Sequence, residues 1–157
     1  MTGPDQPSVD PPCPNPAAIE FHAEDRPVDR LNLSRLRPWI ADTIDQEEHQ
    51  LGALNFIFCS DEFLHEINLR YLHHDSYTDI ITFPYAQAPR VEADIYISLD
   101  RVAENATAYG VAFQQELHRV MIHGVLHLCG YDDKTPKEKK RMRAREDEAL
   151  QRLSPGK

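Results

Sequence analysis

The spacing of apolar and polar positions changes along the chain between a period of two and a period near 3.6 residues, which separates predicted strands from predicted helices. Strands are predicted at residues 18–22, 51–59, 80–83 and 91–98, and helices at 34–48, 61–72, 99–110, 113–129 and 136–153. The first strand is short and alternating, as edge strands are. The order β, α, β, α, β, β, α, α, α predicts an α+β fold with a mixed four-stranded sheet and about five packed helices.

Capping residues set the predicted helix boundaries. The residues expected to cap helix starts are Ser34, Ser60, and either Ser98 or Asp100. Pro38 then falls in the first turn of its helix, where a missing N–H is least disruptive. Gly110 and Gly130 each follow a helix and can adopt the left-handed conformation that ends one. Thr135 and Glu138 form a capping box around Pro136, so the last helix begins there.

The 157 residues predict one folded domain, residues 17–157, preceded by a tail. Residues 1–16 hold six of the 12 prolines among small polar residues, and we expect this tail to be disordered. Three cysteines, Cys13, Cys59 and Cys129, make an odd number that suits a reducing compartment. Because we find neither a leader pattern nor a membrane-spanning apolar run, the sequence predicts a cytoplasmic protein. It carries no signal for the oligomeric state.

Charge is unevenly distributed along the chain. The 17 basic and 26 acidic residues give a net charge of -9, which opposes non-specific attraction to nucleic acid or to an anionic membrane. Residues 134–145, which we call the basic island, nevertheless hold seven of the basic residues and one acid, Glu138. The island is either a solvated helix face, neutralised in part by Glu146, Asp147 and Glu148, or a surface that meets an anionic partner.

The segment MIHGVLHLCGYDDKT, residues 121–135, carries the candidate chemistry. His123 and His127 are four residues apart, so a helix presents both imidazoles on one face. Asp132 and Asp133 follow the helix-ending glycine, and either carboxylate can supply a third ligand. This pattern fits a three-ligand zinc site with a fourth position left open. Gly124 stands where HExxH metallopeptidases carry a catalytic glutamate, which disfavours a peptidase.

The same segment resembles a known family signature. HGVLHLCGYDD (123–133) is similar to the HGxLHLxGYDH signature of the YbeY family of bacterial rRNA maturation factors, which are metal-dependent endoribonucleases. NLRYLHHDSYTDIITFP (68–84) is similar to the family's LNxxYRxxDxPTDVLSFP, EADIYIS (92–98) to its GDIxIS, and MRAREDEAL (142–150) to the pattern of its last helix. The resemblance extends over residues 18–153.

The resemblance implies a metal-binding domain with a zincin-like metal helix, and one zinc ion per chain held by His123, His127 and Asp133. Nickel and manganese remain alternatives, because affinity order is a poor guide to the metal used in a cell. The implied activity is endonucleolytic cleavage of RNA in small-subunit rRNA processing and ribosome quality control. The implied partners are rRNA, the small ribosomal subunit and its assembly factors, with no membrane. A metal-stabilised assembly factor that binds rRNA or ribosomal proteins and hydrolyses little is the alternative.

Two positions depart from the family pattern. Asp133 replaces the third histidine of the signature, and Asp132 is the rival ligand. Leu72 replaces an arginine expected to meet phosphate, so His73 or His74, or Arg70, takes that role or hydrolysis is weak. The candidates for a general base are His74, Asp75 and Asp79. Within the basic island, the residues expected to hold the RNA backbone are Lys134, Lys137, Lys139, Lys140 and Arg141. His65 and His118 are expected to be surface or packing residues.

Overall fold

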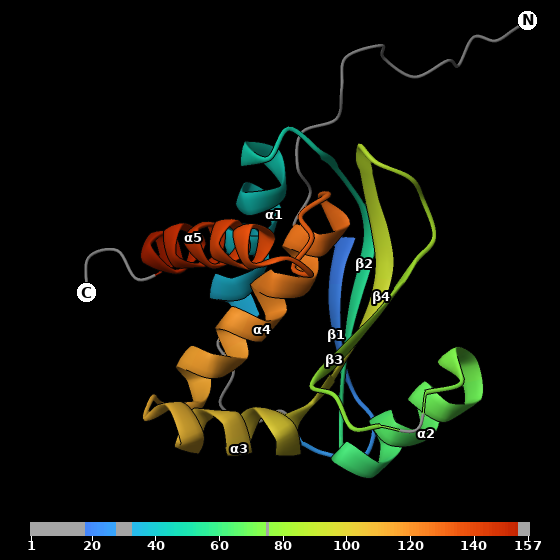
Figure 1. The fold of residues 1–157 in the computed structure, drawn as a ribbon. Coiled ribbons are helices and arrows are strands. Elements are labelled where there is room, and N and C mark those ends of the chain that lie inside the picture. Colours follow the sequence, from blue (N-terminus) through green and yellow to red (C-terminus); the bar gives the residue numbers. More distant parts are fainter. Residues whose placement is uncertain (1–17, 28–32, 75, 154–157) are drawn as a thin grey trace, which may run out of the picture.

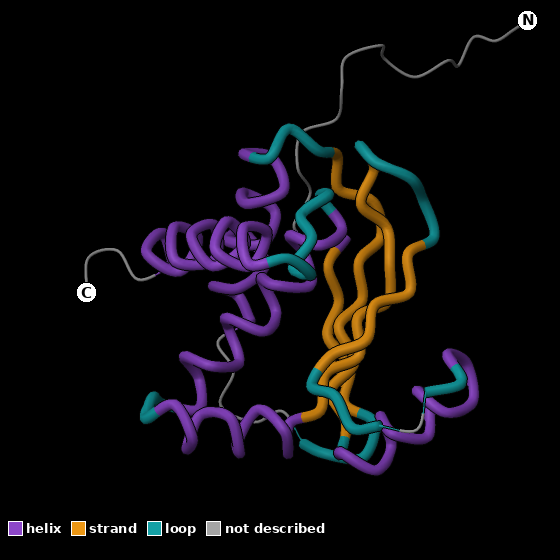
Figure 2. The backbone as a smooth tube through the Cα atoms, viewed as in Figure 1, coloured by secondary structure: helices purple, strands orange, loops and turns teal. Residues whose placement is uncertain are grey.

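The computed structural model describes residues 18–27, 33–74 and 76–153, and the predicted tail, residues 1–16, lies outside this part of the chain. The described residues form the predicted mixed four-stranded sheet (Figures 1 and 2). Its strands are β1 (Ile19–Ala23), β2 (Gln50–Cys59), β3 (Ile80–Pro84) and β4 (Arg90–Ser98), in the order β1-β2-β4-β3. β1, β2 and β4 are parallel, whereas β3 runs antiparallel to β4 at the far edge. The edge position predicted for the first strand is confirmed.

The described residues form five helices, as predicted: α1 (Leu33–Gln46), α2 (Asp61–Leu72), α3 (Leu99–Tyr109), α4 (Phe113–Leu128) and α5 (Pro136–Leu153). Figure 1 shows α1, α4 and α5 on one side of the sheet and α2 on the other. None of the helices in the described part of the chain is long and apolar enough to cross a membrane.

Alternation along β4 divides the apolar residues between the two sides of the sheet. Ala93, Ile95 and Ile97 are fully buried in the larger core with residues of α1 and α4. Tyr96 points to the opposite side and packs in a smaller cluster with Leu64 of α2. A period of two places successive side chains on opposite faces, so β4 is buried on both. The main core therefore lies beneath α4.

Three predicted helix caps are confirmed and one is wrong. The hydroxyl groups of Ser60 and Ser98 accept hydrogen bonds from backbone N–H groups three residues ahead, at 3.1 and 3.0 Å. Thr135 and Glu138 form the reciprocal capping box, with both bonds at 3.0 Å. Ser34, however, lies inside α1, which already includes residue 33, so Pro38 stands beyond the first turn. Serine favours the cap position but does not fix it when the helical pattern continues upstream.

Two glycines position the C-terminal half of α4. A Cβ atom on Gly124 would lie 2.8 Å from the Ile80 side chain, so the absent side chain lets α4 approach β3. Gly130 has the predicted positive φ, +103°, and Tyr131 N–H bonds the Leu126 carbonyl at 3.1 Å beyond the helix end. This arrangement is a Schellman-type reversal, and it turns the following residues back toward α4.

Candidate active site

His123, His127 and Asp133 converge at the C-terminal half of α4. The two imidazole rings lie one turn apart, with centroids 4.6 Å apart and planes at 85°. The reversal at Gly130 brings Asp133 Oδ2 to 3.4 Å from His123 Nε2 and 3.5 Å from His127 Nε2. One ligand atom from each of the three residues lies within 4.8 Å of the other two. The spacing that suggested this group in the sequence does bring it together.

The carboxylate of Asp133 lies at the distance from both imidazoles that a tetrahedral zinc site requires. Zinc bonds of about 2.0–2.1 Å at tetrahedral angles place ligand atoms roughly 3.4 Å apart, close to the two separations that involve Asp133. Asp132 instead is exposed and borders a separate cavity with Glu47 and Arg141. The geometry thus favours Asp133 over its rival, and the donor set of two imidazoles and one carboxylate suits zinc.

Glu146 of α5 supports the far side of His123. Its Oε2 accepts a hydrogen bond from His123 Nδ1 at 2.6 Å, and its Oε1 accepts one from Arg119 at 2.7 Å. An ionised carboxylate only accepts, so Nδ1 carries a proton, and Nε2 is the ring nitrogen that faces Asp133. Burial lowers the pKa of His123, but the hydrogen bond and charge of Glu146 outweigh it, so that this pKa is raised.

Sequence reasoning missed the role of Glu146, which it treated as a surface charge near the basic island. The Glu146 side chain is only 5% exposed. It occupies the buried stripe of α5 with Met142, Ala149 and Leu153. A carboxylate at an apolar stripe position was the available signal, because buried carboxylates are almost always paired.

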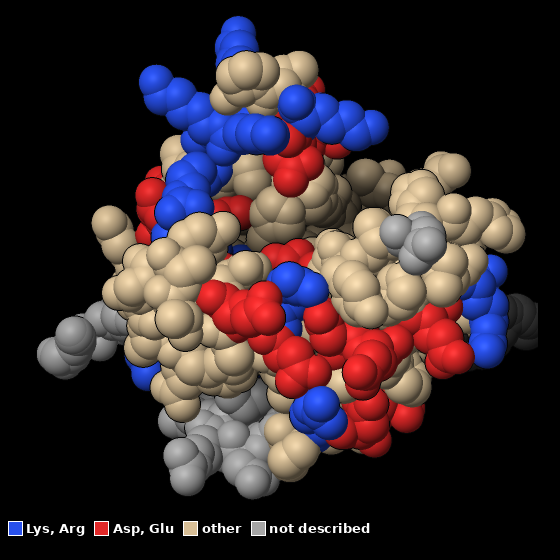
Figure 3. All heavy atoms as spheres, turned by 60° about the horizontal axis from the view of Figure 1, so that its bottom comes forward, with Lys and Arg blue, Asp and Glu red and all other residues tan. Residues whose placement is uncertain are grey.

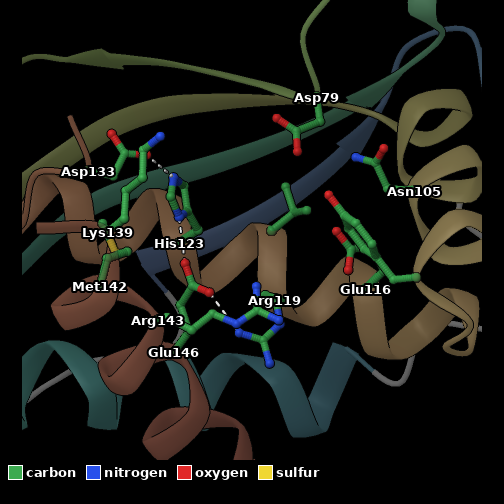
Figure 4. Close-up of a pocket in the computed structure, with 12 residues that line it drawn as sticks. Asp79, Asn105, Glu116, Arg119, His123, Asp133, Lys139, Met142, Arg143 and Glu146 are labelled. Carbon is green, nitrogen blue, oxygen red and sulfur yellow. Dashed lines mark hydrogen bonds and ion pairs between the residues drawn. The ribbon is translucent and has the colours of Figure 1, made fainter. Parts of the chain in front are cut away.

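A cavity of about 420 Å³ opens beside His123 and Asp133 (Figure 4). Helix α3 contributes Asn105 and Tyr109 to its wall, and α4 and α5 contribute most of the rest. In Figure 4, His123 and Asp133 lie at one end of this cavity and Asn105 and Glu116 at the other, with Asp79 above the space between them. The group of His123, His127 and Asp133 therefore lies at one end of a larger site.

Of the three candidate bases, the structure brings Asp79 into this cavity. Burial raises the pKa of the Asp79 carboxyl, with the nearby His123 acting in the opposite direction. A carboxyl group with a raised pKa at the edge of a cavity is suited to proton transfer near neutral pH. His74 is exposed in the connection after α2 and does not line the cavity, and Asp75 lies outside the described residues.

Glu116 is a second carboxylate of the cavity that sequence reasoning did not single out. It lies in the first turn of α4 and is 5% exposed, and its carboxylate forms no hydrogen bond or ion pair with the side chain or backbone of any described residue. Burial raises the pKa of its carboxyl group. The carboxylate borders the cavity, so its oxygens are open to water or to a ligand there.

The basic island begins just before α5 and extends along the first half of that helix. Part of it reaches the cavity. Lys139 and Arg143 line the cavity wall, whereas Lys134, Lys137 and Lys140 are exposed elsewhere. Arg141 lies over the Tyr131 ring, 5.3 Å from its centroid. The five residues predicted to hold RNA form no ion pair within the described part of the chain. Figure 3 shows Lys and Arg gathered at the upper left and a band of Asp and Glu across the middle of that face.

Leu72 does not reach the cavity. It ends α2, which packs on the side of the sheet opposite α4, and it is 39% exposed. Arg70, His73 and His74, the predicted substitutes for the missing arginine, also lie at this helix end and do not line the cavity. Arg143, which was not among them, does. The two histidines that were expected to be surface or packing residues are so: His118 packs edge-on against Trp39, and His65 stacks on Tyr77.

Comparisons of the sequence with known proteins all identify the same family. A family model described as Endoribonuclease YbeY matches residues 18–154. A protein named Endoribonuclease YbeY from Amoebophilus asiaticus is 52% identical over 131 residues, which cover 83% of this chain and 89% of the relative. One of the same name from Bacteroides thetaiotaomicron is 44% identical, covering 85% and 97%. The solution structure of TM1509 from Thermotoga maritima superposes with a TM-score of 0.65 at 28% identity, covering 88% and 99%.

Proposed function

The chain belongs to the YbeY family of endoribonucleases, and from that premise we propose that it is a metal-dependent endoribonuclease of rRNA maturation. Its role would be small-subunit rRNA processing and ribosome quality control in the cytoplasm, with rRNA, the small ribosomal subunit and its assembly factors as partners. The observation that carries this proposal is one cavity that joins a group able to hold a metal ion to Lys139 and Arg143, which pair with no described residue. Both features favour RNA hydrolysis, because its transition state gathers negative charge.

We assign His123, His127 and Asp133 as the ligands of one zinc ion. When bound, the ion supplies Lewis acidity that stabilises negative charge on the scissile phosphodiester. Glu146 holds the ring of His123, and Arg119 holds Glu146 in turn. A fourth ligand would reach the ion from the cavity, which the side chains of His123 and Asp133 both border.

The remaining cavity residues bind substrate and move protons. Lys139 and Arg143 stand one turn apart on α5 and contact non-bridging phosphate oxygens. In this position Arg143 supplies the guanidinium that Leu72 lacks, so the leucine does not remove phosphate binding. Asp79 accepts the proton of the attacking group, as its buried carboxyl faces the same space.

The test compares Asp133→Ala with Asp132→Ala, two neighbouring substitutions of the same type. Purified proteins are assayed for zinc content and for cleavage of structured small-subunit rRNA fragments. We expect Asp133→Ala to lose bound zinc and RNA cleavage together, and Asp132→Ala to keep both. Zinc-loaded protein that binds these fragments without cutting them would instead favour the assembly factor. Equal zinc content in both variants would contradict the ligand assignment.

A further inference from the structure

The end of the cavity remote from the metal ligands has the character of a binding site for a flat, polar ring. We call it the inner subsite and define it by Asn105, Tyr109, Glu116 and Val120. Val120 is buried and gives the subsite an apolar surface, while the Tyr109 ring is 65% exposed beside it. Asn105 and Glu116 add polar groups at the end shown at the right of Figure 4. Apolar surface with a few polar groups is typical of small-ligand sites.

Glu116 sets the chemistry that this subsite requires. An ionised carboxylate is acceptor-only, and no described residue donates a hydrogen bond to this one. Arg119, the nearest cation along α4, already donates to Glu146 and Asp147, both at 2.7 Å. The carboxylate opens into the cavity without a partner among the described residues, so it can accept hydrogen bonds from a ligand that brings N–H donors.

The spacing along α4 relates the subsite to the metal ligands. Glu116 and His123 are seven residues apart, so they lie on one helix face, about 10 Å apart along the axis. That separation is of the order of one nucleotide. A nucleotide with its phosphate beside His123, Lys139 and Arg143 therefore reaches Glu116 with its base.

We propose that the inner subsite binds the guanine base next to the scissile phosphate, with Glu116 accepting hydrogen bonds from its imino and amino groups. Guanine presents two adjacent donors on its Watson–Crick edge, which match the two oxygens of a carboxylate. Adenine and cytosine present one amino donor beside an acceptor, and uracil presents one imino donor between two acceptors. The Asn105 amide donates to the guanine carbonyl, and the Tyr109 ring stacks on the base, as aromatic side chains do with unpaired RNA bases.

The inference rests on the proposed function, yet its first test is independent of cleavage. Binding of the four ribonucleoside monophosphates, and of inosine monophosphate, is measured by calorimetry on the full chain. We expect guanosine monophosphate to bind roughly tenfold or more tightly than the others, including inosine monophosphate, which lacks the amino group. Equal affinities would overturn the proposal.

Glu116→Gln keeps the side-chain size and removes the acceptor pair, and Glu62→Gln is the control on exposed α2. We expect Glu116→Gln to bring the nucleotide affinities within about twofold of one another and Glu62→Gln to keep the guanosine preference. If Glu116→Gln fails to fold, the ranking of nucleotides by the unaltered protein still decides. Manganese binding that Glu116→Gln abolishes, without any nucleotide preference, would overturn the proposal in favour of a cation site.

Cleavage mapping separates this inference from the proposed function. The substrate is an unstructured RNA that contains every dinucleotide. We expect cuts beside guanosine to exceed the others roughly tenfold, and Glu116→Gln to make them even. RNA cutting with no base preference and no preferred nucleotide overturns the inference alone. Preferred binding of guanosine monophosphate without any RNA cutting overturns the proposed function and supports the subsite.

Discussion

His123 is held from both sides of its imidazole ring. Nε2 faces Asp133, while Nδ1 donates to Glu146, which Arg119 fixes in turn. Because these contacts fix the orientation of the ring, the side chain that we propose as a metal ligand is already arranged before any ion binds. Outer partners of this kind raise ligand basicity and limit the reorganisation that metal binding requires.

Removing the charge of Glu146 should weaken metal binding while all three ligands remain. We expect Glu146→Gln to reduce zinc affinity by about 10–100-fold, as outer-shell substitutions typically do. The measurement is competition with a chelating dye. Glu148→Gln, two residues away on exposed α5, is the control and should keep the affinity of the unaltered protein. Equal affinities in the two variants would show that Glu146 only packs against His123.

His118, also on α4, makes stability depend on pH. Burial, aided by the charge of Arg35, lowers the pKa of His118 to about 4, whereas an unfolded chain has a histidine pKa of about 6.5. As pH falls from 6.5 toward 4, the unfolded chain binds a proton that the folded protein does not, so stability falls. We expect this loss to reach about 2 kcal/mol after allowance for partial exposure. Urea unfolding at pH 7.5 and 5 should show a smaller loss for His118→Gln, and an equal loss would contradict the assignment.

For the helices and strands, the sequence predicted those features that depend on the pattern of neighbouring residues. Every strand and helix was placed to within a few residues, and the reversal at Gly130 followed from a single glycine. The start of α1 was wrong because serine favours the cap position without fixing it, and the helix already includes residue 33. Periodicity marks a side chain as buried but does not name its partner. Glu146 and Glu116 therefore gained their roles only when α4, α5 and α3 were packed together.

The approach of α4 to the sheet depends on Gly124, and a larger side chain there should separate them. A Cβ atom would already meet Ile80 at 2.8 Å, and Ile95 lies 3.5 Å away. We expect Gly124→Val to lower the free energy of unfolding by about 2 kcal/mol, a typical cost of overpacking. Ala144→Val, on exposed α5, is the control and should cost less than about 1 kcal/mol. Denaturant unfolding of both variants measures the difference, and equal costs would show that α4 adjusts freely.

Across the whole molecule, acidic and basic groups are used differently. Many of the acids near the carboxyl ends of the parallel strands are engaged by backbone groups: Asp25 accepts from Ser60, and Asp100 accepts from the N–H of Asp61. Within the basic island Arg145 pairs with Glu148, whereas the other six cations form no ion pair with a described residue. A net charge of -9 therefore coexists with a basic wall at the cavity, and it repels RNA from other faces. Segregation of this kind orients a polyanion on approach.

This segregation makes RNA affinity depend on where charge is changed rather than on how much. We expect reversal of Lys139, Lys140 and Arg141 to glutamate to weaken binding of single-stranded RNA and to reduce the salt slope by about 2, because each phosphate contact contributes about 0.7. Reversal of Arg26, Arg70 and Arg90 to glutamate changes the net charge equally on other surfaces and should leave the slope nearly unchanged. Binding titrations over a range of salt concentrations measure both. If the two triple variants lose the same slope, RNA senses the total charge, and the basic island is a solvated helix face.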